Sequence, residues 1–156
     1  MRAYLLGAWG AVATMLSVGL NVGMADDVLP EGAKPLSAIL QQLEGQGISQ
    51  IKEANFDDGV WEIEGMRGAN GVDLKVDAKL GTIIHEKADR HTNLPPKDQL
   101  SVSAIARALE NEGYAPIYEL DWKTKHWEAE ATFKSQRHKV LVNPTTGKVI
   151  SSRRDD

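Results

Sequence analysis

The sequence contains one internal repeat, and this repeat constrains the fold more than any other feature. Residues 36–90 align with residues 102–156 at a constant shift of 66 positions, without a gap and with 15 identities in 55 positions. The identities include the Trp-Glu-x-Glu segments that begin at Trp61 and Trp127. A gap-free match of this length indicates a tandem duplication, so both halves are expected to form the same unit.

Each copy predicts one short helix followed by four strands. A single apolar stripe at helical spacing begins each copy, formed by Leu36, Ile39, Leu40 and Leu43 and by Val102, Ile105, Ala106 and Leu109. Strand-like runs follow at 48–56, 60–67, 71–77 and 83–87, and again at 114–122, 126–133, 138–143 and 149–153. The short loops between these runs favour antiparallel pairing. The predicted fold class is α+β, with two tandem repeats that each pack a short helix on a four-stranded antiparallel sheet.

Alternation along the second strand of each copy assigns its two faces. Trp127 shares one side of run 126–133 with alanines, while Glu128 and Glu130 lie on the other side. We predict that Trp61 and Trp127 pack beneath the helices, and the alternative is that they serve as aromatic anchors for a partner.

Two irregularities are expected in the second copy. Ile117 and Leu120 are three residues apart, so a β-bulge or the entry into a strand must intervene if both point inward. A hairpin turn is predicted near Ser135–Gln136, which would place His126 opposite position 145 and far from His138.

The segments VDAKLGTII (76–84) and VNPTTGKVI (142–150) occupy matching places in the two copies. The Gly147–Lys148 pair lacks the earlier glycine and the following Ser or Thr of a phosphate-binding loop. Both segments instead share an Asp or Asn and a later glycine, residues that close a tight turn. We therefore interpret them as hairpin turns.

The N-terminal 25 residues have the pattern of a secretory signal peptide. Arg2 precedes the uncharged segment Ala3–Leu20, and Gly23 and Ala25 supply a small-x-small cleavage site before Asp26. The alternative is an uncleaved membrane anchor, because the apolar run approaches the ~20 residues that span a bilayer. With cleavage, the protein would be periplasmic or secreted and have no membrane span.

The predicted organisation is a signal peptide at 1–25, an N-terminal tail at 26–35, the first repeat at 36–90, a linker at 91–101 and the second repeat at 102–156. Without Arg2, 17 basic residues (18 − 1) face 22 acidic ones, a net charge of −5 that argues against nucleic acid as a partner. The chain has no cysteine, so its fold must depend on an apolar core and not on disulfides.

No arrangement of side chains predicts catalysis, a cofactor or a metal. Glu62 and Glu64, like Glu128 and Glu130, lie two apart on one strand face with no nucleophile or histidine beside them. The histidines lack the spacing of a metal site and are interpreted as surface residues, namely His85, His91, His126 and His138. The protein is therefore predicted not to be an enzyme.

These features together resemble the PepSY domain. The resemblance covers nearly all of 36–90 and 102–156, and the two turn segments are its most specific parts. PepSY domains occur in propeptides of thermolysin-type metallopeptidases and in exported bacterial proteins. The resemblance implies a role in binding or restraining a peptidase, and it supplies no catalytic residue to carry over.

The leading hypothesis is an exported, non-enzymatic protein-binding module, acting as a peptidase inhibitor or regulator. Its partner would be an envelope or secreted protein, such as a metallopeptidase, bound by the strand face opposite the helices. The candidate residues on that face are Glu62, Glu64, Glu128, Glu130, Lys52, Tyr118 and Lys139. The alternative is a periplasmic sensor of a small ligand or metal ion that feeds a signalling system, which would require a concave apolar pocket between the repeats.

Overall fold

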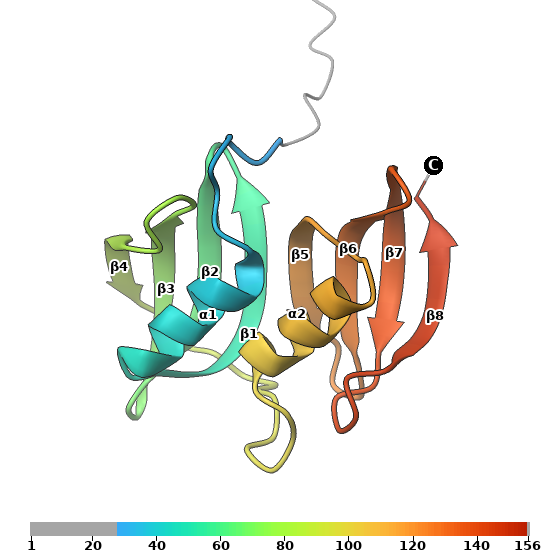
Figure 1. The fold of residues 1–156 in the computed structure, drawn as a ribbon. Helices are drawn as coiled ribbons and strands as arrows, with labels where there is room; N and C mark the ends of the chain where they lie inside the picture. Colours follow the sequence, from blue (N-terminus) through green and yellow to red (C-terminus); the bar gives the residue numbers. More distant parts are fainter. Residues whose placement is uncertain (1–27, 156) are drawn as a thin grey trace, which may run out of the picture.

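The computed structural model describes residues 28–155, so the predicted signal peptide and the start of the tail lie outside the described residues (Figure 1). These residues form two helices, α1 (Leu36–Gly45) and α2 (Val102–Asn111). The strands of the first repeat are β1 (Ile48–Asp57), β2 (Val60–Arg67), β3 (Asn70–Asp77) and β4 (Ile83–Ala88). Those of the second are β5 (Ile117–Trp122), β6 (Trp127–Phe133), β7 (Gln136–Val142) and β8 (Val149–Arg154). The predicted α+β class with two helix-and-four-strand repeats is confirmed.

The two repeats share one antiparallel sheet, which the repeat-by-repeat sequence analysis did not predict. The strand order is β4-β3-β2-β1-β5-β6-β7-β8, so the first strands of the two repeats pair at the centre. Ala54 pairs there with Leu120, its own counterpart 66 residues later. The repeats are therefore related by an approximate two-fold axis through this pair, like two subunits joined by an isologous interface.

Both helices lie side by side on one face of this sheet (Figure 1). The apolar core lies between the helices and the sheet. Trp61 and Trp127 are 0% and 1% exposed, which confirms that they pack beneath the helices. Each contacts an aromatic ring of the preceding strand, with ring centroids 5.5 Å apart in both the Phe56–Trp61 and Trp122–Trp127 pairs. The duplicated sequence thus produces duplicated core packing.

The predicted bulge is present in both copies. The register of β5 on β6 shifts between Ile117 and Glu119, and that of β1 on β2 shifts between Ser49 and Glu53. In the first copy the bulge packs against Gly65, where an added Cβ would approach the Ile48 and Ile51 side chains to 3.2 Å. Each bulge lets residues three apart point into the core.

The two matching turn segments have the predicted turn chemistry. Asp77 Oδ1 accepts hydrogen bonds from the backbone N–H groups of Lys79 and Leu80. Asn143 Oδ1 accepts the equivalent bonds from the two residues at matching positions, Thr145 and Thr146. Gly81 and Gly147 have φ of +70° and +71°. The turn predicted near Ser135–Gln136 is wrong by one residue, because Phe133 pairs with Gln136 and the turn residues are Lys134 and Ser135. Both adopt positive φ, as a two-residue hairpin loop requires.

Each helix caps the first turn of the other helix. Glu110, near the end of α2, accepts hydrogen bonds from the Ser37 backbone N–H (3.1 Å) and hydroxyl (2.5 Å). Glu44, near the end of α1, accepts the equivalent bonds from Ser103 (3.2 and 2.6 Å). A carboxylate at a helix N-terminus satisfies unpaired N–H groups and interacts favourably with the helix dipole. This reciprocal capping ties the two repeats together across the two-fold axis.

The capping predicts a specific loss of stability. We expect Glu110→Ala to lower the free energy of unfolding by about 1–2 kcal/mol, because two charge-assisted hydrogen bonds are lost. Glu112→Ala, at an exposed position two residues later, is the matched control and should change stability by less than about 0.5 kcal/mol. Urea unfolding followed by tryptophan fluorescence measures both, and equal effects would show that Glu110 has no special role.

Candidate functional site: the open sheet face

The sheet face opposite the helices, here called the open face, is covered by no described helix (Figure 1). Cross-strand pairing arranges its side chains in two rows that run across the strands. The first, here called the acidic row, reads Lys87, Asp73, Glu64, Glu53, Asp121, Glu128, Leu141 and Ser151 from β4 to β8. The second, here called the mixed row, reads His85, Lys75, Glu62, Asn55, Glu119, Glu130, Lys139 and Arg153.

The acidic row contains five carboxylates in succession, from Asp73 on β3 to Glu128 on β6. Neighbouring strands lie about 4.8 Å apart, so every pair in this run opposes like charges at short range. Like charges directly opposite one another destabilise a sheet by roughly 0.2–1 kcal/mol per pair. The centre of the open face therefore carries an electrostatic cost that the fold itself does not require.

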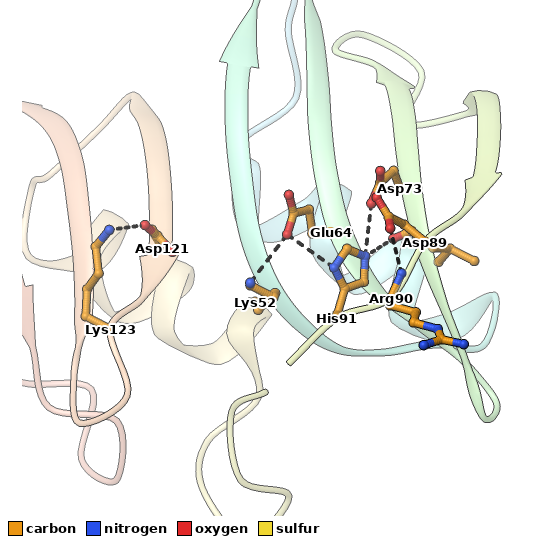
Figure 2. Close-up of polar contacts among 9 residues, drawn as sticks. Lys52, Glu64, Asp73, Asp89, Arg90, His91, Asp121 and Lys123 are labelled. Carbon is orange, nitrogen blue, oxygen red and sulfur yellow. Dashed lines mark hydrogen bonds and ion pairs between the residues drawn. The ribbon is translucent and has the colours of Figure 1, made fainter. Parts of the chain in front are cut away.

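Most cations lie toward the two edges of the face, although the acidic row itself ends in Leu141 and Ser151 at the β8 edge. Lys87 Nζ is 3.3 Å from Asp73, Lys75 Nζ is 3.1 Å from Glu62, and Lys139 Nζ is 3.7 Å from Asp155. Nearer the centre, Lys52 Nζ lies 3.5 Å from Glu64, and Lys123 pairs with Asp121 (Figure 2). The open face thus has an acidic centre between more basic flanks.

The two central glutamates, Glu53 and Glu119, have raised pKa values because of burial first and of neighbouring charges second. Burial raises the pKa of Glu53, and the charges of Glu64 and Asp121 raise it further. Burial also raises the pKa of Glu119, followed by the charges of Glu130 and Asp121. Half-buried carboxylates with raised pKa values gain most from a cation or a proton supplied from outside.

All the residues that sequence analysis placed on this face lie there. Glu62 and Glu64 are neighbours on β2, Glu128 and Glu130 on β6, and Lys139 opposes Glu130. Two others, Lys52 and Tyr118, lie at the bulges of β1 and β5 and are partly exposed. Their part in binding a partner stays a prediction.

Sequence analysis missed the acidic residues at the centre of the face. Glu53, Glu119 and Asp121 belong to strands that pair across the repeats, and nothing within one repeat predicts that pairing. A signal did exist, because Glu53 and Glu119 are identical at matching positions.

The two repeats differ on the outer part of this face. In the second repeat, the Arg137 guanidinium stacks over the Tyr118 ring at 3.2 Å from its centroid and pairs with Glu130. The first repeat has Gly71 at the position of Arg137 and Asp73 at the position of Lys139. Two positions that carry cations in one repeat thus carry a glycine and a carboxylate in the other.

The start of the linker fills the space above Gly71. His91 packs on the open face with its side chain only 5% exposed, so its interpretation as a surface histidine is wrong. Its Nε2 lies 3.1 Å from the Val72 carbonyl oxygen and 2.9 Å from Asp73 Oδ1, and its Nδ1 lies 3.4 Å from Glu64 Oε2 (Figure 2). The linker contacts both repeats, since Pro95 accepts a hydrogen bond from Gln50 and Asn93 accepts one from Thr124.

A groove of about 510 Å³ lies between the repeats beneath the linker. Its walls include Ile48 and Ile51 of the first repeat, Pro95 and Leu100 of the linker, and Trp127 of the second repeat. The groove has the position that the small-ligand alternative requires, and its lining is mixed, since it also includes Glu44 and Lys97.

The structure places one serine beside a histidine, a pairing that was not predicted from the sequence. Ser152 Oγ lies 3.0 Å from His138 Nδ1 at the solvent-exposed β7–β8 edge. Such an exposed position lacks the desolvation and orienting contacts that activate a serine nucleophile, so the pair gives little support for catalysis.

Comparison with known proteins points to one family. The model of the family described as "Peptidase propeptide and YPEB domain" matches twice, over residues 9–87 and 88–153. No curated protein matches the sequence. Among the described residues, no helix has the length and apolar character needed to cross a membrane.

Two solved structures are similar in chain trace at low sequence identity. A candidate lipoprotein from Clostridium difficile 630 has 13% identity and a TM-score of 0.45, over 81% of this chain and 96% of its own. The C-terminal domain of YpeB from Bacillus megaterium has 13% identity and a TM-score of 0.32, over 84% of this chain and 70% of its own.

The crowding at Glu119 predicts how stability depends on pH. Its folded-state pKa lies above the ordinary value of 4.5. At pH values between 4.5 and the folded-state pKa, the folded chain therefore binds more protons than the unfolded chain. The unfavourable contribution of Glu119 to the free energy of unfolding should therefore shrink as pH falls through this window from neutrality. The charges that face Glu119 are those of Glu130, Asp121 and Glu128, opposed by Lys123.

We expect Glu119→Gln to raise the free energy of unfolding at pH 7 by roughly 0.5–1 kcal/mol, because it removes one member of the like-charge pair with Glu130. The gain should shrink as pH approaches 4.5, and urea unfolding across this range measures it. Glu112→Gln, at an exposed position, serves as the control. A loss of stability at pH 7 would show that the Glu119 carboxylate stabilises the sheet.

Proposed function

Because the chain belongs to the peptidase propeptide and YPEB domain family, we propose that it is an exported, non-enzymatic protein-binding module that acts through its open face. The observation that carries this proposal is the acidic row. A run of five carboxylates, opposed in register, reduces stability in the free protein. Such a run is expected where a partner supplies the missing positive charge.

The partner that this face fits is a protein with a basic segment. Glu53, Asp121 and Glu128 lie at the centre of the face, and the row has Lys87 at one end and the uncharged Leu141 and Ser151 at the other, which would disfavour a displaced register. Flat sheet faces with interdigitating side chains also support large protein interfaces without a deep pocket. A secreted or envelope protein is the partner class consistent with the predicted signal peptide.

The finer proposal is that the partner is a peptidase, for example a metallopeptidase, which the module inhibits or regulates. Support comes from the family, whose description names peptidase propeptides. A direct assay would follow the activity of thermolysin-type metallopeptidases with increasing amounts of this protein.

The small-ligand alternative is supported by the groove beneath the linker. A ligand there would contact both repeats, so its binding would stabilise the whole fold. At 100 times its Kd it would add about 2.7 kcal/mol to the free energy of unfolding. Thermal-shift screening with the full chain tests this alternative separately from the open face.

A triple variant tests the open-face proposal. We expect Glu53→Gln, Asp121→Asn and Glu128→Gln together to weaken partner retention by on the order of tenfold or more while raising thermal stability. Opposite changes in binding and stability would separate a binding surface from a structural one. The measurement is quantitative pull-down from an envelope extract, followed by affinity determination with the retained protein.

The matched control neutralises three exposed acids elsewhere, Glu31→Gln, Asp98→Asn and Glu112→Gln. It changes net charge by the same amount and should leave the affinity unchanged. A partner retained equally by both triple variants would exclude the acidic row as its binding site. Salt at 0.5 M should also weaken binding, because exposed charges are strongly screened at that ionic strength.

A further inference from the structure

The first repeat contains a compact group of metal-ligand side chains on the open face. Glu64 on β2, Asp73 on β3 and His91 in the linker each offer a ligand atom, and these atoms lie within 4.8 Å of one another. A nitrogen from histidine with two carboxylate oxygens matches the ligand types of Zn²⁺ and related divalent transition metals. Figure 2 shows the imidazole held between the two carboxylates.

The histidine is built into the structure like a ligand and not like a surface residue. Its side chain is 5% exposed, and the Val72 carbonyl oxygen lies 3.1 Å from Nε2. A hydrogen bond from Nε2 to this carbonyl leaves Nδ1 as the nitrogen that can bind a metal, and Asp73, which lies 2.9 Å from Nε2, would have to turn toward the ion. The other ring nitrogen faces Glu64.

The carboxylates around His91 are incompletely compensated. Asp73 Oδ1 is fully buried, and its close polar neighbour is His91 Nε2 at 2.9 Å, a nitrogen that also lies 3.1 Å from the Val72 carbonyl oxygen. The Asp89 carboxyl, which also accepts a hydrogen bond from the Arg90 backbone, lies in hydrogen-bonding contact with Asp73. A third carboxyl group therefore lies beside the two of the candidate site.

The second repeat supplies an internal comparison. There the equivalent carboxylates, Glu130 and Asp155, contact Arg137 and Lys139. The first repeat has Gly71 and Asp73 at those two positions, and so it loses two fixed cations and gains an acid. Lys52 and Lys87 offset only part of this difference, at 3.5 and 3.3 Å from their partners.

Gly71 is what allows the linker to reach this position. A Cβ at residue 71 would lie 2.2 Å from the Asp89 carbonyl oxygen and 3.0 Å from His91 Cδ2. The Asp89 backbone N–H donates to the Gly71 carbonyl at 3.0 Å, so the chain is held against β3 just before His91. Any side chain here would push His91 away from the two carboxylates.

We propose that Glu64, Asp73 and His91 form a binding site for a divalent transition metal ion of the Zn²⁺ type. The metal would supply the positive charge that the second repeat obtains from Arg137 and Lys139. It would also fasten the linker to the sheet, because His91 is the only linker residue in the group. This inference does not depend on any protein partner.

The test is isothermal titration of the full chain with ZnCl₂, in parallel with CoCl₂ monitored by visible absorption. One ion should bind per chain, and His91→Ala or Asp73→Asn should each weaken binding by on the order of tenfold or more. Lys87→Gln should tighten it several-fold, because it removes an ammonium that competes for Asp73. A purely structural role for the cluster would not produce that gain.

His138→Ala, in the second repeat, is the matched control and should bind Zn²⁺ like the wild type. If His91→Ala alters the fold, amide chemical shifts of the wild type give an independent answer, with Zn²⁺ expected to shift Gly71, Val72 and His91. The proposal is overturned by wild-type protein that binds no Zn²⁺ up to about 1 mM. It is equally overturned by unchanged affinity in His91→Ala, or by shifts confined to other histidines. Partner binding by the acidic row can be measured with EDTA present to remove metal ions, so its outcome is independent of the metal-binding test.

Discussion

The reciprocal contact between each helix and the first turn of the other is the interaction on which the arrangement of the repeats depends. Glu44 and Glu110 lie at matching positions, and each carboxylate binds the serine that begins the opposite helix. Only an antiparallel, side-by-side placement of the helices satisfies both contacts at once. That placement also brings Gln41 to within 2.7 Å of Arg107, its own counterpart in the second repeat.

Once the helices are placed in this way, β1 and β5 meet at the two-fold axis and the two sheets become one. The uncovered face then brings together acidic residues that are distant in sequence, including Glu53 and Asp121. Within each repeat the same residues would lie at a sheet edge, where water would screen them well. Joining the repeats therefore links the two short acidic runs, Asp73–Glu64–Glu53 in the first repeat and Asp121–Glu128 in the second, into one run of five carboxylates.

Much of this fold could be predicted from the sequence because local patterns determine it. The helical stripes, the strand alternation around Trp61 and Trp127, the bulge at Ile117 and the turns closed by Gly81 and Gly147 all depend on residues close in sequence. The helix bounds and most strand bounds follow from the same patterns.

The candidate site was harder to predict because it depends on contacts between distant segments. Pairing of Ala54 with Leu120 depends on the two-fold axis, which has no local signature. His91 falls in a segment rich in proline and polar residues, which favours an exposed linker. Its burial follows from a glycine twenty residues earlier, where the missing Cβ leaves room for an imidazole.

The difference between Gly71 and Arg137 makes the two ends of the open face chemically different. Two identical subunits around a true two-fold axis would present the same chemistry at both ends, and a ligand could lie across them in either of two equivalent orientations. Covalent fusion removed this restriction, since each half could then change alone. The second repeat now carries a guanidinium stacked on Tyr118, and the first carries carboxylates around an imidazole with lysines beside them. An elongated partner that lies across the sheet should therefore bind in one orientation in preference to the reverse orientation.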